Sequence, residues 1–292
     1  MRILVIGGSG QVGSELVRQA PPAHAVFAPP SSALDIADAG GVAAQLEETG
    51  AQVVVNCAAY HRVVECETHA EEAFRVNCVA IRDLARACRA RGAKLVSISS
   101  DYVFDGVRAE PYREDDCPRP IQVYGITRRA GECAALAEHA EGAAIVRTSA
   151  VFGVARSRSR DGNFITKCVE TARKTGRLEV AVENTISPTY AADLAAALLK
   201  LIGLPTFFPG VYHLTNEGTC SWFELARYAI QELKIKCDIV PVDRGSCSGA
   251  MLRPRQSVLS NTRAAALGVR LPAWEDAVSR FLAAADPRAG SA

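Results

Sequence analysis

Short apolar runs alternate with longer amphipathic stretches over the first 150 residues. The runs are rich in β-branched residues and predict strands, whereas the stretches rich in alanine, leucine and arginine predict helices. Strands that are apolar nearly throughout and are separated by helices indicate a parallel sheet covered on both faces, which is a doubly wound α/β fold. We expect strands at 2–6, 25–28, 52–56, 94–99 and 143–148, and helices at 11–19, about 70–91 and about 122–139.

The pattern loosens after Phe152. The segment 154–162 carries three arginines without periodicity, which predicts a surface loop. The few strands beyond it do not suffice for a second large sheet, so we expect residues 1–152 to form one domain and 153–285 a smaller interleaved lobe. Polar clusters predict a connection at 245–249 and a flexible tail at 286–292. In this half we expect helices at about 164–174, 191–202 and 221–233, and strands at about 178–182 and 211–214.

Composition excludes several classes of function. The 33 lysines and arginines nearly balance the 32 aspartates and glutamates, so the net charge of +1 lacks the basic excess of a general nucleic-acid binder. No apolar run reaches the roughly 18 residues that cross a bilayer, and the first ten residues end in glycines, so we expect no membrane anchor and no signal peptide. No two of the ten cysteines are three residues apart, which favours reduced cysteines in a cytoplasmic protein over metal or redox sites.

A glycine-rich segment follows the first expected strand directly. Gly7, Gly10 and Gly13 have GxxGxxG spacing at the start of a helix. The first glycine allows a tight turn, the second lets the backbone approach a pyrophosphate, and the third permits close packing of helix on strand. A purely structural turn is the alternative, but the position after the first strand of a βαβ series favours a dinucleotide. The second strand ends in APPSS, without an acidic residue or an arginine, so the choice between NAD and NADP stays open.

Hydroxyl-bearing residues follow the fourth strand. Ser100 is expected at the carboxyl end of that strand, where open α/β sheets bind ligands. Tyr124 opens the next helix, and Arg128 lies one turn further on the same face, so both side chains can point into one cleft. This arrangement predicts a hydride-transfer site.

The chain resembles the dTDP-4-dehydrorhamnose reductase family of extended short-chain dehydrogenases/reductases. The resemblance implies a Rossmann domain at 1–152, a substrate-binding lobe, and NADPH- or NADH-dependent reduction of the C4 ketone of a nucleotide-linked deoxysugar. The matching segments follow the family's order across almost the whole chain: GGSGQVG (7–13), LDIAD (34–38), VVNCAAY (54–60), SSDYVFDG (99–106), YGITRRAGE (124–132), RTSAVFG (147–153), GNF (162–164), SPTYAADLA (187–195), GVYHLTNEGTCSW (210–222) and RPRQSVLSN (253–261).

The resemblance also implies roles for single residues. Tyr124 would give a proton to the substrate's carbonyl oxygen, Ser100 would hydrogen-bond that oxygen, and Arg128 would hold the nicotinamide ribose while lowering the pKa of Tyr124. No metal is expected. The implied cofactor residues are Gly7, Gly10, Gln11, Val12, Gly13, Asp35, Ile36, Ala58, Ala59, Tyr60, Tyr124 and Arg128, and the implied substrate residues are Ser100, Asp101, Tyr102 and Arg253.

Three positions depart from the family pattern. Arg128 replaces the family's lysine, which keeps the charge but exchanges a compact ammonium for a planar guanidinium. Ala150 replaces a tryptophan and removes an aromatic wall against the sugar. The segment 61–64 replaces the family's TAVD-like stretch. The identity of the sugar therefore stays open.

Several other side chains have competing interpretations. His61 could touch cofactor or substrate, or lie on the surface. Arg62 could bind a diphosphate, but a solvated or structurally paired arginine is favoured. We expect His213 to be a satisfied core histidine and both Trp222 and Phe223 to be packing residues. Glu15 matches a family glutamate linked with metal-assisted dimers, but we expect an exposed helical carboxylate.

A second class of function stays open beside the reductase. The regulatory subunit of methionine adenosyltransferase is catalytically silent, resembles these reductases and carries a segment like SSDYVFDG. Tyr124 and Ser100 favour the enzyme, whereas Arg128 and Ala150 favour the silent protein. An epimerase or dehydratase would use the same tyrosine. As partners we expect a nucleotide-sugar, neither nucleic acid nor membrane, and the resemblance leaves a homodimer open.

Overall fold

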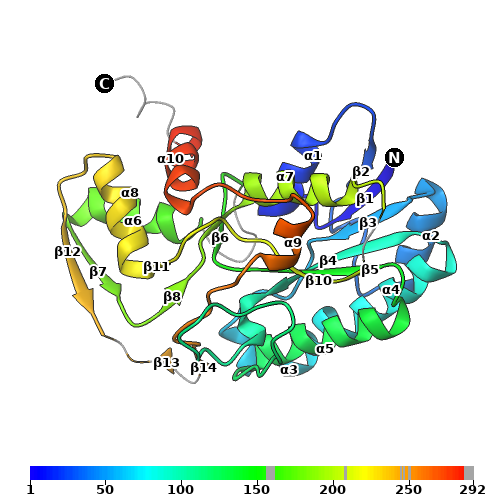
Figure 1. The fold of residues 1–292 in the computed structure, drawn as a ribbon, viewed down its shortest axis with the longest axis horizontal. Coiled ribbons are helices and arrows are strands. Elements are labelled where there is room, and N and C mark those ends of the chain that lie inside the picture. Colours follow the sequence, from blue (N-terminus) through cyan, green and yellow to red (C-terminus); the bar gives the residue numbers. More distant parts are fainter. Residues whose placement is uncertain (156–161, 207–208, 244, 246, 249–250, 286–292) are drawn as a thin grey trace.

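A six-stranded sheet lies at the centre of the computed structural model, which describes residues 1–155, 162–206, 209–243, 245, 247–248 and 251–285 (Figure 1). All its strand pairs are parallel, so the carboxyl ends of the strands meet at one edge. The predicted doubly wound sheet is confirmed. The strands, in spatial order, are β10 (Gly210–His213), β5 (Ala143–Thr148), β4 (Lys94–Ser100), β3 (Val53–Asn56), β1 (Arg2–Ile6) and β2 (Ala25–Phe27).

Helices cover both faces of this sheet because successive strand residues point to opposite sides. Ile3 and Val5 of β1 pack in the hydrophobic cluster that contains residues of α1 (Gln11–Gln19) and α7 (Ala191–Ile202). Leu4 of the same strand packs in the opposite cluster. That second cluster contains residues of α2 (Ala39–Thr49), α4 (Ala80–Ala90) and α5 (Val123–Glu138).

Two helical features differ from the sequence prediction. The helix α2 was not expected. It begins directly after Asp38, whose carboxylate accepts hydrogen bonds from the N–H groups of Gly40 and Gly41, and it ends directly before Gly50, which has the left-handed conformation. The helix expected at about 70–91 is continuous but not uniform. It runs through α3 (Ala70–Phe74), the π-helical turn η2 (Arg75–Val79) and α4.

The second half of the chain builds a lobe with its own core. Phe152, Ile165, Leu225, Trp274 and Phe281 are buried together in this core. Between its elements the chain returns to the central sheet through α7 and β10, so the lobe is interleaved. Its elements are β6 (Val151–Phe152), α6 (Phe164–Thr175), β7 (Arg177–Ala181), β8 (Thr185–Ile186), β9 (Thr189–Tyr190), β11 (Cys220–Ser221), α8 (Trp222–Glu232), β12 (Asp238–Val242) and α10 (Trp274–Ala285).

Short elements complete the described structure. The sequence patterns did not predict β12, α10 or the helix α9 (Thr262–Ala266). The expected tail at 286–292 and most of the expected loop at 154–162 lie outside the described residues. The remaining short elements are η1 (Glu65–Glu67), η3 (Asp101–Val103), β13 (Cys247–Ser248) and β14 (Met251–Leu252).

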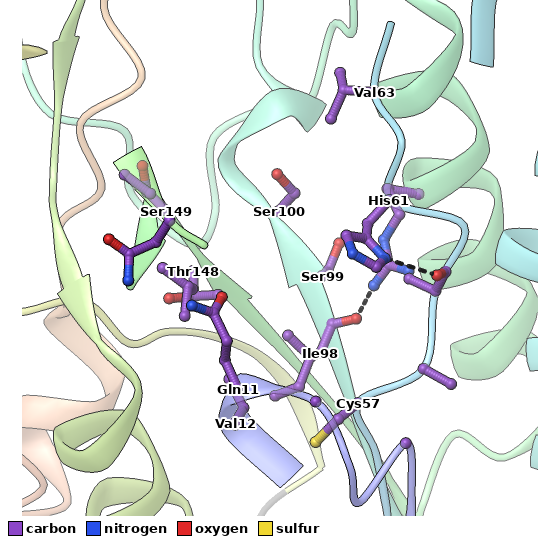
Figure 2. A pocket seen from close by; sticks show the side chains of 18 of the residues that line it. Gln11, Val12, Cys57, His61, Val63, Ile98, Ser99, Ser100, Thr148 and Ser149 are labelled. Carbon is purple, nitrogen blue, oxygen red and sulfur yellow. Dashed lines mark hydrogen bonds between the residues drawn. The ribbon is translucent and has the colours of Figure 1, made fainter. Parts of the chain in front are cut away.

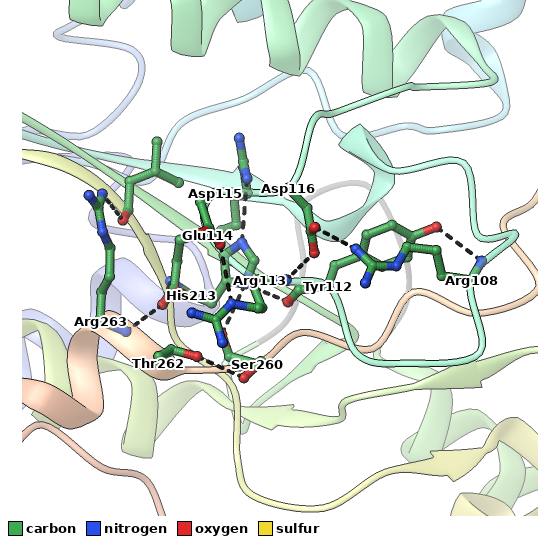
Figure 3. Close-up of polar contacts among 12 residues, drawn as sticks. Arg108, Tyr112, Arg113, Glu114, Asp115, Asp116, His213, Ser260, Thr262 and Arg263 are labelled. Carbon is green, nitrogen blue, oxygen red and sulfur yellow. Dashed lines mark hydrogen bonds and ion pairs between the residues drawn. The ribbon is translucent and has the colours of Figure 1, made fainter.

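His213 connects β10 to the segment around Tyr112 (Figure 3). Its Nδ1 lies 3.1 Å from the Tyr112 carbonyl oxygen and 3.2 Å from that of Ser260. Burial and the neighbouring Arg147 lower the pKa of His213 to about 3, so the imidazole is neutral at physiological pH. Glu114 accepts the backbone N–H of Arg263 at 2.9 Å and so ties α9 to the same segment. The expected core histidine is confirmed.

A buried ion pair joins α5 to the sheet. Arg147 of β5 and Glu132 of α5 are 1% and 2% exposed, and the guanidinium donates to both carboxylate oxygens at 2.8 and 2.7 Å. Ser99 of β4 donates to the same carboxylate at 2.6 Å. Glu132 therefore holds α5 against two neighbouring strands at once.

Removal of this carboxylate should destabilise the protein strongly. We expect Glu132→Ala to lower the free energy of unfolding by about 3–5 kcal/mol, because it leaves the Arg147 cation buried and unpaired. The exposed pair Glu72–Arg75, 2.7 Å apart, is the control, and Glu72→Ala should cost less than about 1 kcal/mol. Urea denaturation measures both variants. Equal losses in the two would show that the buried pair does not stabilise the fold.

Candidate active site

A cavity of about 640 Å³ opens at the carboxyl edge of the sheet. Gly10 lines it from the loop after β1, and Ala58 lines it from the loop after β3. Ser100 lines it from the end of β4 and Thr148 from the end of β5 (Figure 2). The strand order reverses between β1 and β3, and ligands of open α/β sheets bind at such a reversal. Topology alone thus brings these four loops to one site.

The glycine loop has the shape that a dinucleotide requires. Gly7 has a φ of +81°, and a Cβ there would lie 2.9 Å from the Ala58 backbone nitrogen, so no larger residue fits. A Cβ at Gly13 would lie 2.3 Å from the Gly7 carbonyl oxygen, so this glycine lets α1 pack against the loop. Gly10 lines the cavity directly before α1. Its backbone and the first N–H groups of the helix form a cradle suited to a pyrophosphate.

Most of the expected cofactor residues line this cavity, but two do not. Gly13 acts through packing. Tyr60 holds the neighbouring loop, since its backbone N–H donates to Asn77 at 2.9 Å and its hydroxyl donates to Glu65 at 3.4 Å. In the segment between β2 and α2, Asp35 is exposed and accepts the Ala37 N–H at 2.9 Å. The expected cofactor residues that line the cavity are Gly7, Gly10, Gln11, Val12, Asp35, Ile36, Ala58, Ala59, Tyr124 and Arg128.

The three expected reacting groups lie together in the cavity. Tyr124 comes from the first turn of α5, Arg128 from the next turn and Ser100 from the end of β4. Burial raises the pKa of Tyr124, and the neighbouring Asp101 carboxylate raises it further. The charge of Arg128 lowers that pKa, as does a hydrogen bond between Tyr124 and Ser100, but burial is the largest effect. Tyr124 is therefore protonated at neutral pH.

Arg128 is a buried cation, 5% exposed. Its guanidinium donates to the Ile98 carbonyl oxygen of β4 and, at 3.4 Å, to Asn77 of the π-helical turn. Within the described parts of the chain, no carboxylate lies within ion-pair distance of it. Its positive charge is thus directed at Tyr124 without neutralisation by a partner.

Asp101 orients the Ser100 side chain. The Ser100 hydroxyl donates to Asp101 at 2.9 Å, and Ser149 donates to the second carboxylate oxygen at 2.8 Å. Burial raises the pKa of Asp101, whereas hydrogen bonds from these serines and from Ser257 lower it. The expected substrate residues Ser100 and Asp101 are therefore one hydrogen-bonded unit, and both line the cavity.

The lobe supplies an aromatic wall to the cavity. Phe164 begins α6 and Trp222 begins α8, and their ring centroids lie 4.6 Å apart. Both side chains line the cavity, so Trp222 does more than the expected packing. Arg253 also lines the cavity and donates to the Tyr102 hydroxyl at 3.4 Å. The sequence has no signal that separates Trp222 from its neighbour Phe223.

Comparisons with known proteins agree with this geometry. The model of the RmlD substrate binding domain family matches residues 1–286. The chain belongs to the RmlD family of dTDP-4-dehydrorhamnose reductases. It is 35% identical to the spore coat polysaccharide biosynthesis protein SpsK of Bacillus subtilis over 96% of both chains. It is 37% identical to the dTDP-4-dehydrorhamnose reductase of Streptomyces griseus over 99% of this chain and 95% of the relative.

A solved structure supports the same family. The dTDP-4-dehydrorhamnose reductase of Bacillus anthracis, crystallised in complex with NADP, superposes with a TM-score of 0.89 at 32% identity. The match covers 98% of this chain and 99% of that chain. The Rossmann-type fold of this family member is therefore confirmed.

The remaining expectations for this RmlD family member have mixed outcomes. His61 lines the cavity, whereas Arg62 pairs with Glu65 at 3.1 Å and does not line it. The expectation that Glu15 is exposed is wrong: it is 7% exposed because α1 packs against α7, and its carboxylate accepts hydrogen bonds from Arg18 and Gln19. The described residues contain no group of acidic, histidine or cysteine side chains that could hold a metal. They also contain no helix with the length and apolarity to span a bilayer.

A larger residue at Gly10 should block the pyrophosphate cradle. Gly10 has a φ of −79°, which any residue adopts, and a Cβ there would lie 3.3 Å from the Gly7 carbonyl oxygen. We expect Gly10→Val to fold and to lose at least about tenfold in affinity for NADPH. Gly40→Val, at the start of α2 and outside the cavity, is the control. Calorimetric titration that finds unchanged affinity in folded Gly10→Val would remove the glycine loop from the binding site.

Proposed function

We propose that this chain reduces the C4 keto group of a dTDP-linked 6-deoxysugar with NADPH or NADH. The observation that carries the proposal is the single cavity that joins the glycine loop to Ser100, Tyr124 and Arg128. The activity named for its relatives supports this substrate class. The NADP in the related crystal structure supports the cofactor.

The chain's own residues would move the proton in this reaction. A bound nicotinamide cofactor would supply the hydride. Tyr124 is protonated at neutral pH and would give its proton to the carbonyl oxygen. From the end of β4, Ser100 would donate its one hydroxyl proton to the same oxygen in place of Asp101. Arg128 would stabilise the phenolate that Tyr124 becomes, because an adjacent positive charge favours the anionic form.

We also propose a division of work between the two halves of the chain. Residues 1–152 would hold the dinucleotide, and the lobe within 153–285 would hold the nucleotide-sugar. The aromatic wall of Phe164 and Trp222, together with Arg253, supports this division. An aromatic surface and a cation suit a nucleotide base or sugar ring and its diphosphate, respectively.

Removal of the Tyr124 hydroxyl should abolish most of the turnover. General acid catalysis contributes about 10²- to 10⁴-fold in rate, so Tyr124→Phe should lower kcat by that factor while the Kd for NADPH stays within a few fold. Tyr228→Phe is the matched control, because it removes a phenol hydroxyl that contacts Ser279 on α10 and does not line the cavity. NADPH oxidation with dTDP-4-keto-6-deoxysugars measures both. A Tyr124→Phe variant as fast as the parent would show that another group gives the proton.

The charge of Arg128 should control how kcat depends on pH. Reduction needs protonated Tyr124, so the rate is expected to fall as the pH rises through the raised pKa of this tyrosine. Arg128 lowers that pKa; Arg128→Ala should therefore raise it and move the alkaline limb of kcat to higher pH, with a lower plateau. Arg128→Lys keeps the charge and should retain turnover.

The parent and the two Arg128 variants also distinguish an active reductase from a catalytically silent protein. In a silent protein, Arg128 would serve only its contacts to Ile98 and Asn77. Turnover in neither the parent nor Arg128→Lys, with measurable binding of NADPH, would contradict the proposed activity.

A further inference from the structure

Three side chains that line the cavity carry a buried polar atom without a hydrogen-bond partner in the described structure. They are Gln11 (Nε2), Thr148 (Oγ1) and Arg128 (Nε). Such atoms are rare in native proteins, and they are expected where a ligand completes the hydrogen bonds. The other nitrogens of Arg128 are already bonded to Ile98 and Asn77. The side chains of Gln11 and Thr148 are neutral, and each can form a further hydrogen bond to a ligand.

Gln11 and Thr148 lie on the same side of the sheet. Val146 packs in the cluster that contains residues of α1 and α7, and Thr148 is two residues further along β5, so it points to the same face. Gln11 is the first residue of α1, and Figure 2 shows its side chain extending toward Thr148. Its Nε2 would lie 3.8 Å from a Cβ placed on Gly153.

Thr148 is also a neighbour of the reacting groups. It is 5% exposed, and it pairs in register with Ser100 on β4, so the two hydroxyl-bearing side chains lie one strand spacing apart, about 4.8 Å, on the same face. The Gln11–Thr148 pair therefore brings together a residue at the start of α1, beside the glycine loop where the pyrophosphate is expected, and a residue on the strand next to Ser100, where the substrate carbonyl is expected.

We propose that Gln11 and Thr148 bind the carboxamide of the nicotinamide ring. A primary carboxamide has a carbonyl oxygen that accepts and an amino group that donates. The Gln11 Nε2 can donate to the former, and the Thr148 Oγ1 can accept from the latter. A pyrophosphate would need only donors, which the backbone of the glycine loop provides.

This role would make the two residues positioning residues for the reaction. A carboxamide held at one point fixes the rotation of the nicotinamide ring about its bond to the ribose. The fixed ring would then present one face toward Ser100 and Tyr124. The inference rests on the proposed use of a nicotinamide cofactor, but it does not depend on which sugar is reduced.

Two ligands test the inference by calorimetry without any substrate. NADPH contains the carboxamide, whereas 2′-phospho-ADP-ribose has the same adenine end and diphosphate but no nicotinamide. Thr148→Val removes the hydroxyl at nearly constant shape, and we expect it to weaken NADPH binding about threefold to tenfold, the typical effect of one hydrogen bond. Its affinity for 2′-phospho-ADP-ribose should stay unchanged. Thr148→Ser keeps the hydroxyl and should bind NADPH within twofold of the parent.

Gln11→Leu provides an independent second test. It should show the same selective loss, and the double variant should lose less than the product of the single effects, because both groups bind one carboxamide. Equal losses for both ligands, no loss for NADPH, or a change confined to the KM of the sugar would each overturn the inference. Parent protein that binds NADPH but reduces no sugar would contradict the proposed function and leave this test intact.

Discussion

The position of α5 depends on one buried carboxylate. Tyr124, Arg128 and Glu132 are four residues apart, so they lie on one face of this helix. Glu132 bonds to Ser99 on β4 and to Arg147 on β5, and these two residues are themselves partners in the sheet register. Because the ion pair is buried, movement of the helix would separate charges in a medium that solvates them poorly. The helix is thereby fixed with Tyr124 in the cavity that Ser100 lines.

Burial and charge act in opposite directions on Tyr124. Desolvation favours the neutral phenol, and Arg128 favours the phenolate, with burial the larger effect. The balance suits a proton donor: the phenol keeps its proton until the substrate oxygen takes it, and the cation then lowers the energy of the anion that remains. The guanidinium of Arg128 supplies this positive charge, and its nitrogens also donate hydrogen bonds to Ile98 and Asn77. The sheet and the π-helical turn therefore hold it in position.

The sequence predicted those parts of the fold in which local pattern and tertiary packing agree. The bounds of β1, α1 and α7 match the expected ranges, since their apolar positions have the period of the element that forms. The helix α2 was missed because two adjacent glycines weaken its pattern, and its stability comes from the Asp38 cap and from burial of one face. The five-residue π-helical turn is too short to produce its own hydrophobic period within the longer helix, so the residue pattern alone cannot locate it.

The residue pattern of the sequence predicts only some of the side chains that line the cavity. Glycine spacing and a tyrosine followed by a cation are local signals, and they predicted the cofactor loop and the reacting groups. That the Thr148 hydroxyl has no partner among the described residues, or that Trp222 faces a cavity, depends on segments far away in the chain. The lobe also changes what Ala150 implies about the sugar site. Ala150 lines the cavity with a φ of +43°, a conformation that disfavours bulky side chains. Phe164 and Trp222 provide aromatic surface to the cavity from two helices of the lobe. A small residue at 150 therefore does not by itself argue against a sugar site.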